Sequence, residues 1–461
     1  MAFRDHLAPV IGALVLSAFA HSPPVSAGTL PTEVQVHTLD NGLQVYLAPM
    51  DSPGVVSWQL RMAVGSGDET EPGTTGFAHF FEHLMFHDTT TMTREQRQAA
   101  LNLLGVSDNA WTWTDETVYH AVIPPSALPD LIALEADRFR NLALTPDGVR
   151  REAGAVYGEF RKGRTDPLNV ALEAHFNAAF DVHPYHHDTI GVEDDIAAMP
   201  EQHALAMSFF DTWYRPGQAR LVVAGDIDPA ATLSLIEQHF GPWEAGPEPP
   251  PRPPEPPQEA PRRAYTAWDG GPTNALLLMG WRVPGFDPRS PDAAALSLIE
   301  DLLLSDVAPL YRDLVVDDPL TYELWGGSWR WVDPHLFLVT AELRDPADLA
   351  EVEARVLAAL EPLAQGIDPA VLDRAKGHAL RAARLGLDNP TSVAGALGAF
   401  TRVDPAPDAI DAFYANFEAL TVEDVQRVIT TYFVPERLTV TVLDPTQQPP
   451  PAPAEPEEEA P

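Results

Sequence analysis

The chain contains no cysteine among its 461 residues, and basic residues are few. The lack of cysteine excludes disulfides, thiolate metal sites and cysteine nucleophiles. Lys and Arg number 29 against 67 Asp and Glu, which gives a formal net charge of -38. Such a charge repels the phosphates of nucleic acids and anionic lipids, and we therefore expect no nucleic-acid partner.

Long hydrophobic runs are also scarce. The apolar run Leu7–Ala20 is too short to span a bilayer, and no later segment reaches the required length. Val25 and Ala27 are small residues in the places that signal peptidases require before Gly28. We expect residues 1–27 to be a signal peptide and the protein to be exported to the periplasm or cell envelope. The mature chain should have no membrane span; a retained, anchoring segment is the alternative.

Proline, by contrast, is abundant and divides the chain. Residues 244–263 are too rich in proline for a helix or an inner strand, so we predict a semi-rigid linker. Residues 445–461 combine proline with glutamate and are expected to be a disordered acidic tail. The linker separates a first half, residues 28–243, from a second half, residues 264–444.

The two halves resemble each other in sequence. A helix end, a proline and an alternating strand recur around Pro216 and Pro435, which lie 219 positions apart. A shift of 218 positions superposes the segment HFFEHL on SLIEDL and brings Ser297 and Asp301 onto the two histidines. We interpret this as a duplication in which the second copy has lost its ligands. Chance recurrence of short amphipathic patterns is the alternative.

The first half mixes strand and helix patterns. Residues 34–47 alternate between apolar and polar side chains on both sides of Asn41-Gly42, a pair typical of tight hairpin turns. A second alternating segment, residues 55–64, predicts another strand. These patterns alone support only a mixed α and β fold.

The segment HFFEH places two imidazoles and a carboxylate on one face of a predicted helix. At about 100° per residue, His79, Glu82 and His83 lie together, opposite the aromatic face. Histidines one turn apart can both bind a single Zn²⁺ through a ring nitrogen. Glu82 is then placed to take a proton from a water that the metal polarises. The alternative is three solvated residues at the rim of a core.

A second predicted helix offers further carboxylates. It spans Thr145–Arg164, with Thr145 as its N-cap and Pro146 in its first turn. Glu152 and Glu159 are seven residues apart, and two helical turns return to within about 20° of the same face. Both side chains can therefore point to one site, although an exposed acidic face is the commoner arrangement.

Several other segments accompany the H-x-x-E-H segment along the chain. They are NAWT (109–112), EADRFRNL (135–142), EAGAVYGE (152–159), HPYHHDTIGVEDDI (183–196) and WYRPGQARLVVAGDID (213–228). Together they resemble the pitrilysin or insulinase-type metallopeptidases with the inverted zinc motif, and within them a bacterial subgroup similar to the processing peptidases. The resemblance is strong over most of residues 34–228 and weak in the second half.

The resemblance implies specific roles. His79, His83 and Glu159 would bind one Zn²⁺ per chain, and Glu82 would be the catalytic base. Glu152 would support the site from behind the ligands. Residues 28–243 would then form the catalytic zinc-binding domain and residues 264–444 a degenerate homologous domain without metal.

Substrate binding is implied at two further places. An edge strand would pair with the peptide, which suits sequence-tolerant cleavage because main-chain hydrogen bonds hold the substrate. Its residues are Asn109, Ala110, Trp111 and Thr112. In the second half, Tyr322 matches a substrate-binding tyrosine, but Pro309 stands where the resemblance expects an arginine. We therefore expect a heterodimer in which a homologous subunit supplies an Arg/Tyr pair.

The implied fold is α+β, with two homologous domains, each an antiparallel sheet with helices on one face, joined by the Pro-rich linker. The implied activity is that of a zinc endopeptidase that hydrolyses peptides or unfolded polypeptides in an enclosed chamber. Two alternatives remain: a non-catalytic core-type scaffold subunit, and an exported metal-storage or sensor protein.

Overall fold

The computed structural model of the protein describes residues 28–446. The predicted signal peptide and the tail from residue 447 onward lie outside these residues. Within residues 28–446, no helix is both long and apolar enough to cross a membrane.

The first half forms a six-stranded sheet with the strand order β1-β2-β6-β3-β5-β4. Its strands are β1 (Gln35–Thr38), β2 (Gln44–Pro49), β3 (Val56–Met62), β4 (Ser107–Thr112), β5 (Thr117–Ile123) and β6 (Ala219–Gly225). Its helices are α1 (Phe77–Leu84), α2 (Arg94–Leu104), α3 (Leu128–Asn141), α4 (Pro146–Gly163), α5 (Pro167–Ala179), α6 (Glu193–Ala198), α7 (His203–Trp213) and α8 (Pro229–Phe240). The predicted hairpin is confirmed, because β1 and β2 pair antiparallel and Gly42 has a φ of 95° in the connecting loop.

The second half forms a five-stranded sheet with the strand order β7-β11-β8-β10-β9. Its strands are β7 (Arg262–Thr266), β8 (Leu276–Val283), β9 (Thr321–Ser328), β10 (His335–Leu343) and β11 (Leu438–Leu443). Its helices are α9 (Pro291–Leu304), α10 (Pro309–Tyr311), α11 (Leu349–Gln365), α12 (Pro369–Gly386), α13 (Pro390–Thr401), α14 (Ala409–Ala419) and α15 (Val422–Tyr432). The predicted α+β fold with two similar domains is confirmed.

The two sheets have the same topology once β1 is set aside. In each sheet one strand pair is parallel, β2 with β6 and β7 with β11, while the other pairs are antiparallel. Gln44 pairs with Arg220 and Arg262 pairs with Thr439, so the paired positions are displaced by 218 and 219 residues. The offset seen in the sequence thus recurs in the strand register, as expected for an internal duplication.

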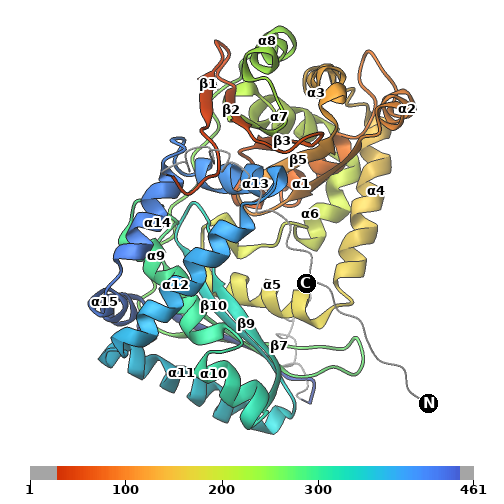
Figure 1. The fold of residues 1–461 in the computed structure, drawn as a ribbon. Coiled ribbons are helices and arrows are strands. Elements are labelled where there is room, and N and C mark those ends of the chain that lie inside the picture. Colours follow the sequence, from red (N-terminus) through yellow and green to blue (C-terminus); the bar gives the residue numbers. More distant parts are fainter. Residues whose placement is uncertain (1–27, 447–461) are drawn as a thin grey trace, which may run out of the picture.

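The halves exchange one helix each. Helix α5 of the first half lies against β7, β8 and β11 of the second sheet, and α13 of the second half lies against β3 and β6 of the first (Figure 1). Ala171 of α5 packs with Leu278, and Leu397 of α13 belongs to the same core as Val222. Each sheet is therefore covered on both faces, which explains why every residue of β3, β6 and β8 is buried. The expectation of antiparallel sheets with helices on one face is wrong in these two respects, because each sheet has one parallel pair and receives a helix from the other half.

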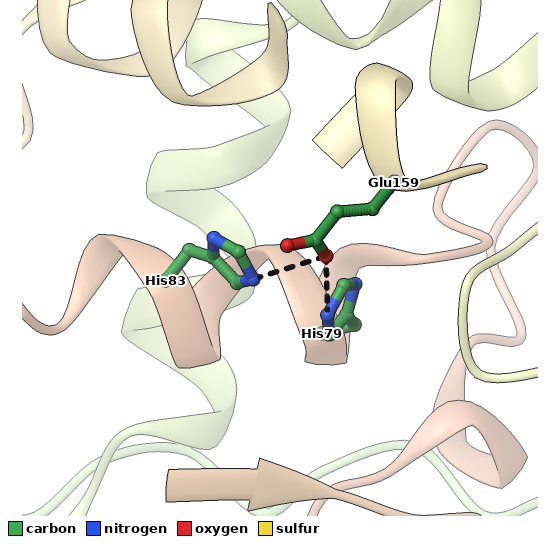
Figure 2. Close-up of side chains that lie close together, drawn as sticks. All are labelled: His79, His83 and Glu159. Atoms are coloured by element: carbon green, nitrogen blue, oxygen red, sulfur yellow. Dashed lines mark ion pairs between the residues drawn. The ribbon is translucent and has the colours of Figure 1, made fainter. Parts of the chain in front are cut away.

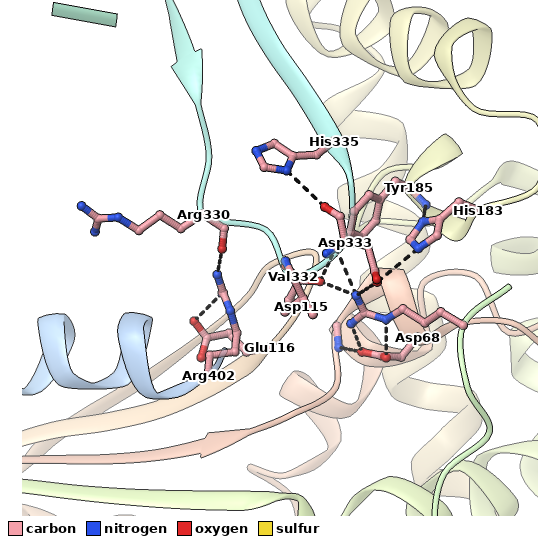
Figure 3. A network of polar contacts seen from close by, with 12 residues as sticks. Asp68, Asp115, Glu116, His183, Tyr185, Arg330, Val332, Asp333, His335 and Arg402 are labelled. Atoms are coloured by element: carbon pink, nitrogen blue, oxygen red, sulfur yellow. Dashed lines mark hydrogen bonds and ion pairs between the residues drawn. The ribbon is translucent and has the colours of Figure 1, made fainter. Parts of the chain in front are cut away.

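Arg252 of the Pro-rich segment contacts both halves. Arg252 donates to Asp68 (2.7 and 2.9 Å) and to Asp115 (2.6 Å) in the first half and to Asp333 (2.9 Å) in the second. Asp115 also accepts a hydrogen bond from the backbone N–H of Val332, so carboxylates and backbone from both halves meet in one network (Figure 3). The linker is thus held against the domains and does more than set the spacing between them.

Candidate active site

Helix α1 presents its polar face away from the core, as predicted. Phe77, Phe80 and Phe81 are fully buried, while His79 and His83 are partly exposed on the other side. The helix begins after Gly76, whose φ of 84° favours glycine and whose added Cβ would lie 2.6 Å from the carbonyl oxygen of Ile190.

A buried carboxylate holds the first turn of α1. Glu69 accepts hydrogen bonds from the backbone N–H groups of Gly76 (2.8 Å) and Ala78 (2.7 Å), which have no partner within the helix. Burial raises the pKa of Glu69 well above its usual value, although these two bonds oppose the shift. Sequence reasoning missed this contact, because Glu69 lies in a loop outside any helical pattern.

Three of the predicted site residues converge on one point. The Oε2 atom of Glu159 lies 3.4 Å from Nε2 of His79 and 3.5 Å from Nε2 of His83 (Figure 2). Ligands of tetrahedral Zn²⁺ at 2.0–2.1 Å are separated by about 3.3 Å, and both distances from Glu159 are close to that value. In the described part of the chain, no other group of three His, Asp or Glu side chains is placed to hold a metal ion.

Helix α4 supplies the carboxylates of the site. The prediction of its N-terminus is confirmed: the hydroxyl of Thr145 accepts from the backbone N–H of Gly148, and Pro146 is the first helical residue. Glu159 is half exposed at the meeting point, whereas Glu152, two turns earlier, is more enclosed and contacts the other side of the His83 ring. Glu152 therefore lies at Nδ1 of His83, and Glu159 lies at Nε2 of the same ring.

The surroundings shift the pKa values of His79 and His83 in opposite directions. Burial, with a smaller effect of the neighbouring His83, lowers the pKa of His79 to about 4, which keeps its imidazole neutral near pH 7. The hydrogen bond from Nδ1 of His83 to Glu152 (2.9 Å) raises the pKa of His83 and favours a proton on Nδ1. That bond leaves the lone pair of Nε2 directed at Glu159, the geometry that a metal ligand needs.

Glu82 lies beside the histidines and contacts the edge strand. Its Oε2 atom accepts a hydrogen bond of 2.7 Å from the hydroxyl of Thr112, the last residue of β4. Burial raises the pKa of Glu82, and the Thr112 hydroxyl partly opposes that shift. A carboxylate with a raised pKa accepts protons more readily, so Glu82 is suited to act as a general base.

Comparison with known proteins agrees with this geometry. Residues 48–193 match the family described as "Insulinase (Peptidase family M16)", and residues 205–377 match "Peptidase M16 inactive domain". The chain belongs to the M16 family of peptidases.

Relatives of this M16 family member cover nearly the whole chain. The protein named "Zinc protease PqqE" from Helicobacter pylori is 29% identical over 416 residues, which are 88% of this chain and 92% of that protein. The crystal structure of a protease from Helicobacter pylori has a TM-score of 0.85 at 28% identity and covers 90% of this chain and 100% of its own. The periplasmic protease PqqL from Escherichia coli has the same fold (TM-score 0.74, 20% identity), and the match covers 91% of this chain but only 48% of PqqL.

The second half of this M16 family member lacks the histidine pair. Ser297 and Asp301 occupy the corresponding positions on α9, while Glu300 stands where Glu82 does. Glu300 accepts from the backbone N–H of Ser328 at the end of β9, much as Glu82 accepts from Thr112 at the end of β4. Burial raises the pKa of Glu300 to about 7. The second half thus keeps the carboxylate and its strand contact without the nitrogen donors.

The residues predicted to bind substrate lie on two edge strands. Asn109, Ala110, Trp111 and Thr112 lie on β4, which ends the first sheet. Tyr322 lies on β9, which ends the second sheet, and its exposed ring packs under the guanidinium of Arg344 at 4.3 Å. Pro309, at the expected arginine position, begins α10.

Proposed function

We propose that this protein is a zinc-dependent endopeptidase that cleaves peptides or unfolded polypeptides. The observation that carries the proposal is the convergence of His79, His83 and Glu159 on one point, with Glu82 beside it. His79, His83 and Glu159 would hold the ion. When bound there, zinc supplies a Lewis acid that polarises the scissile carbonyl and the attacking water.

The protein's own groups account for the proton transfers. Glu82 takes the proton of the attacking water and passes it to the leaving amine, because its raised pKa suits both steps. The Thr112 hydroxyl fixes the Glu82 carboxylate by donating to its Oε2 atom. Because Thr112 ends the edge strand β4, the base is placed next to the main chain of any peptide that pairs with β4.

We further propose that Asn109, Ala110, Trp111 and Thr112 bind the substrate as an added strand and that Tyr322 contributes from the second half. Pro309 cannot supply the guanidinium expected there, so a homologous subunit would provide the Arg/Tyr pair in a heterodimer that encloses the substrate in a chamber. The match to only 48% of the PqqL chain supports this pairing, because a chain about twice as long has room for two units that each have both domains of this protein.

Export to the periplasm or envelope is part of the proposal. It rests on the sequence of residues 1–27 and on the similarity in fold to PqqL, a periplasmic protease. N-terminal sequencing of the protein from its native cell should begin at Gly28; an intact residue 1 would refute cleavage.

The decisive experiment compares equivalent glutamates in the two halves. The tagged chain, purified from its native cells with any copurifying subunit, is assayed with an unfolded protein and with fluorogenic peptides, and its zinc is counted by mass spectrometry. Glu82→Gln should abolish hydrolysis while one zinc per chain remains. Glu300→Gln, the same change at the corresponding position of α9, should retain hydrolysis. A wild-type complex with no zinc and no hydrolysis would instead favour the non-catalytic scaffold.

A further inference from the structure

His87 lies just beyond the end of α1 and contacts Glu152. The carboxylate of Glu152 bridges two imidazoles: Oε1 lies 2.9 Å from Nδ1 of His83, and Oε2 lies 2.6 Å from Nε2 of His87. All three side chains are largely enclosed, with exposed fractions of 21% for His83, 15% for Glu152 and 14% for His87. Both oxygens of Glu152 therefore have a partner sheltered from water.

The backbone holds His87 at a fixed place relative to α4. The N–H of His87 donates to the carbonyl of Leu84, which continues the turn at the end of α1. The next residue, Asp88, accepts at its carbonyl from the N–H of Ala143, two residues before the N-cap of α4. The backbone after α1 is thus hydrogen-bonded to the backbone before α4, which fixes the position of the His87 ring relative to Glu152.

We propose that His87 is a positioning residue that orients His83 through Glu152. This inference rests on the proposed function, since it assumes that His83 is a zinc ligand. A carboxylate with one bonded oxygen can turn about its terminal torsion, which is broad for glutamate. With His87 bonded to the second oxygen, Glu152 is held at both ends, and the bond to Nδ1 of His83 keeps its direction. Nε2 of His83 then stays directed at the meeting point.

His87 is not itself placed as a ligand. Its Nε2 atom is bonded to Glu152, and it does not belong to the group whose donor atoms converge with Glu159. Its effect must therefore pass through Glu152 to His83. Groups that orient a metal-bound histidine in this way typically change metal affinity by about 10–100-fold when removed.

The test uses three substitutions of His87 in the full chain. Leu removes the hydrogen bond, Asn keeps an amide that is too short to reach Glu152, and Gln carries an amide N–H at about the position of Nε2. The zinc dissociation constant is measured by chelator competition, and the unfolding temperature of each metal-free variant is recorded. We expect Leu and Asn to weaken zinc binding at least about tenfold and Gln to recover most of the loss.

The outcomes separate the possible roles. A merely structural His87 would lower the unfolding temperature of the metal-free protein in all three variants and leave zinc affinity unchanged, which overturns the inference. Equal affinities for Gln and Asn would overturn it as well, because only Gln restores the bond. If Leu does not fold, the Gln and Asn pair still decides. A wild-type chain that binds no zinc would overturn the proposed function first; zinc binding with unaffected variants would overturn this inference alone.

Discussion

Removing the Arg252 side chain should destabilise the protein far more than removing an exposed arginine. The guanidinium contacts carboxylates of both halves, and two of them, Asp68 and Asp115, have side-chain exposures of only 7% and 0%. Taking away one partner of a buried ion pair leaves uncompensated charge and costs about 3–5 kcal/mol. We expect Arg252→Ala to lower the free energy of unfolding, measured by urea denaturation at pH 7, by that amount.

The control is an arginine with an equally good but more exposed pair. Arg263 donates to both oxygens of Glu353 at 2.8 and 3.0 Å, with exposed fractions of 38% and 19%. Arg263→Ala should therefore cost no more than about 1 kcal/mol. Equal losses for Arg252→Ala and Arg263→Ala would refute the reasoning that burial makes the difference.

The loss at Arg252 should also depend on pH. Burial alone would raise the pKa of Asp115, but Arg252 and Arg402 hold it below its usual value, so Asp115 stabilises the wild type above the unfolded pKa. At Asp68 burial outweighs Arg252, and its pKa is already raised. Without Arg252 the pKa values of both Asp68 and Asp115 should rise. Acidification then protonates these carboxylates, which removes the uncompensated negative charge that destabilises the variant. The difference between wild type and Arg252→Ala should narrow from pH 7 towards about pH 4, the usual range of aspartate.

Three further results are expected. Glu159→Ala should weaken zinc binding at least about tenfold, measured by chelator competition, because it removes one of three donors; unchanged affinity would refute its role. Because burial raises the pKa of Glu82, the acid limb of the pH–activity profile should lie above the usual glutamate pKa. Thr112→Val removes the hydrogen bond that lowers this pKa, so it should move the acid limb to higher pH. A move to lower pH would contradict the role of Glu82 as the base. Leu397→Ala, which truncates a fully buried side chain of α13, should cost about 2–5 kcal/mol in urea denaturation, and a loss below 1 kcal/mol would mean that the exchanged helix packs loosely.

Local patterns predicted much of the fold. The spacing of Phe80, Phe81 and Leu84 identified the buried face of α1, and Thr145 and Pro146 marked the start of α4. The exchange of α5 and α13 could not be predicted in this way, because an apolar helix face does not say which sheet it will cover. The same holds for the one parallel strand pair in each sheet, which depends on how distant strands are brought together.

The candidate site was predictable only in part. The spacing of His79 and His83 indicated a metal site, and helical geometry allowed Glu152 and Glu159 to share a face, but only family resemblance singled out Glu159. Metal binding itself stays a prediction. His87 was missed although it follows His83 by four residues, because the helix ends before it and helical spacing no longer applies. Arg252 was missed because contacts across 184 and 137 residues have no local signature.

The crossed helices have a consequence for a chain cut in the Pro-rich segment. Each fragment would still have its own helix inserted against the other fragment's sheet, so the two pieces should migrate together on size exclusion until a denaturant separates them. For the same reason neither fragment, produced without the other, would have a complete core: one apolar sheet face would be open to water. A cell must therefore synthesise both halves before either can reach its final form.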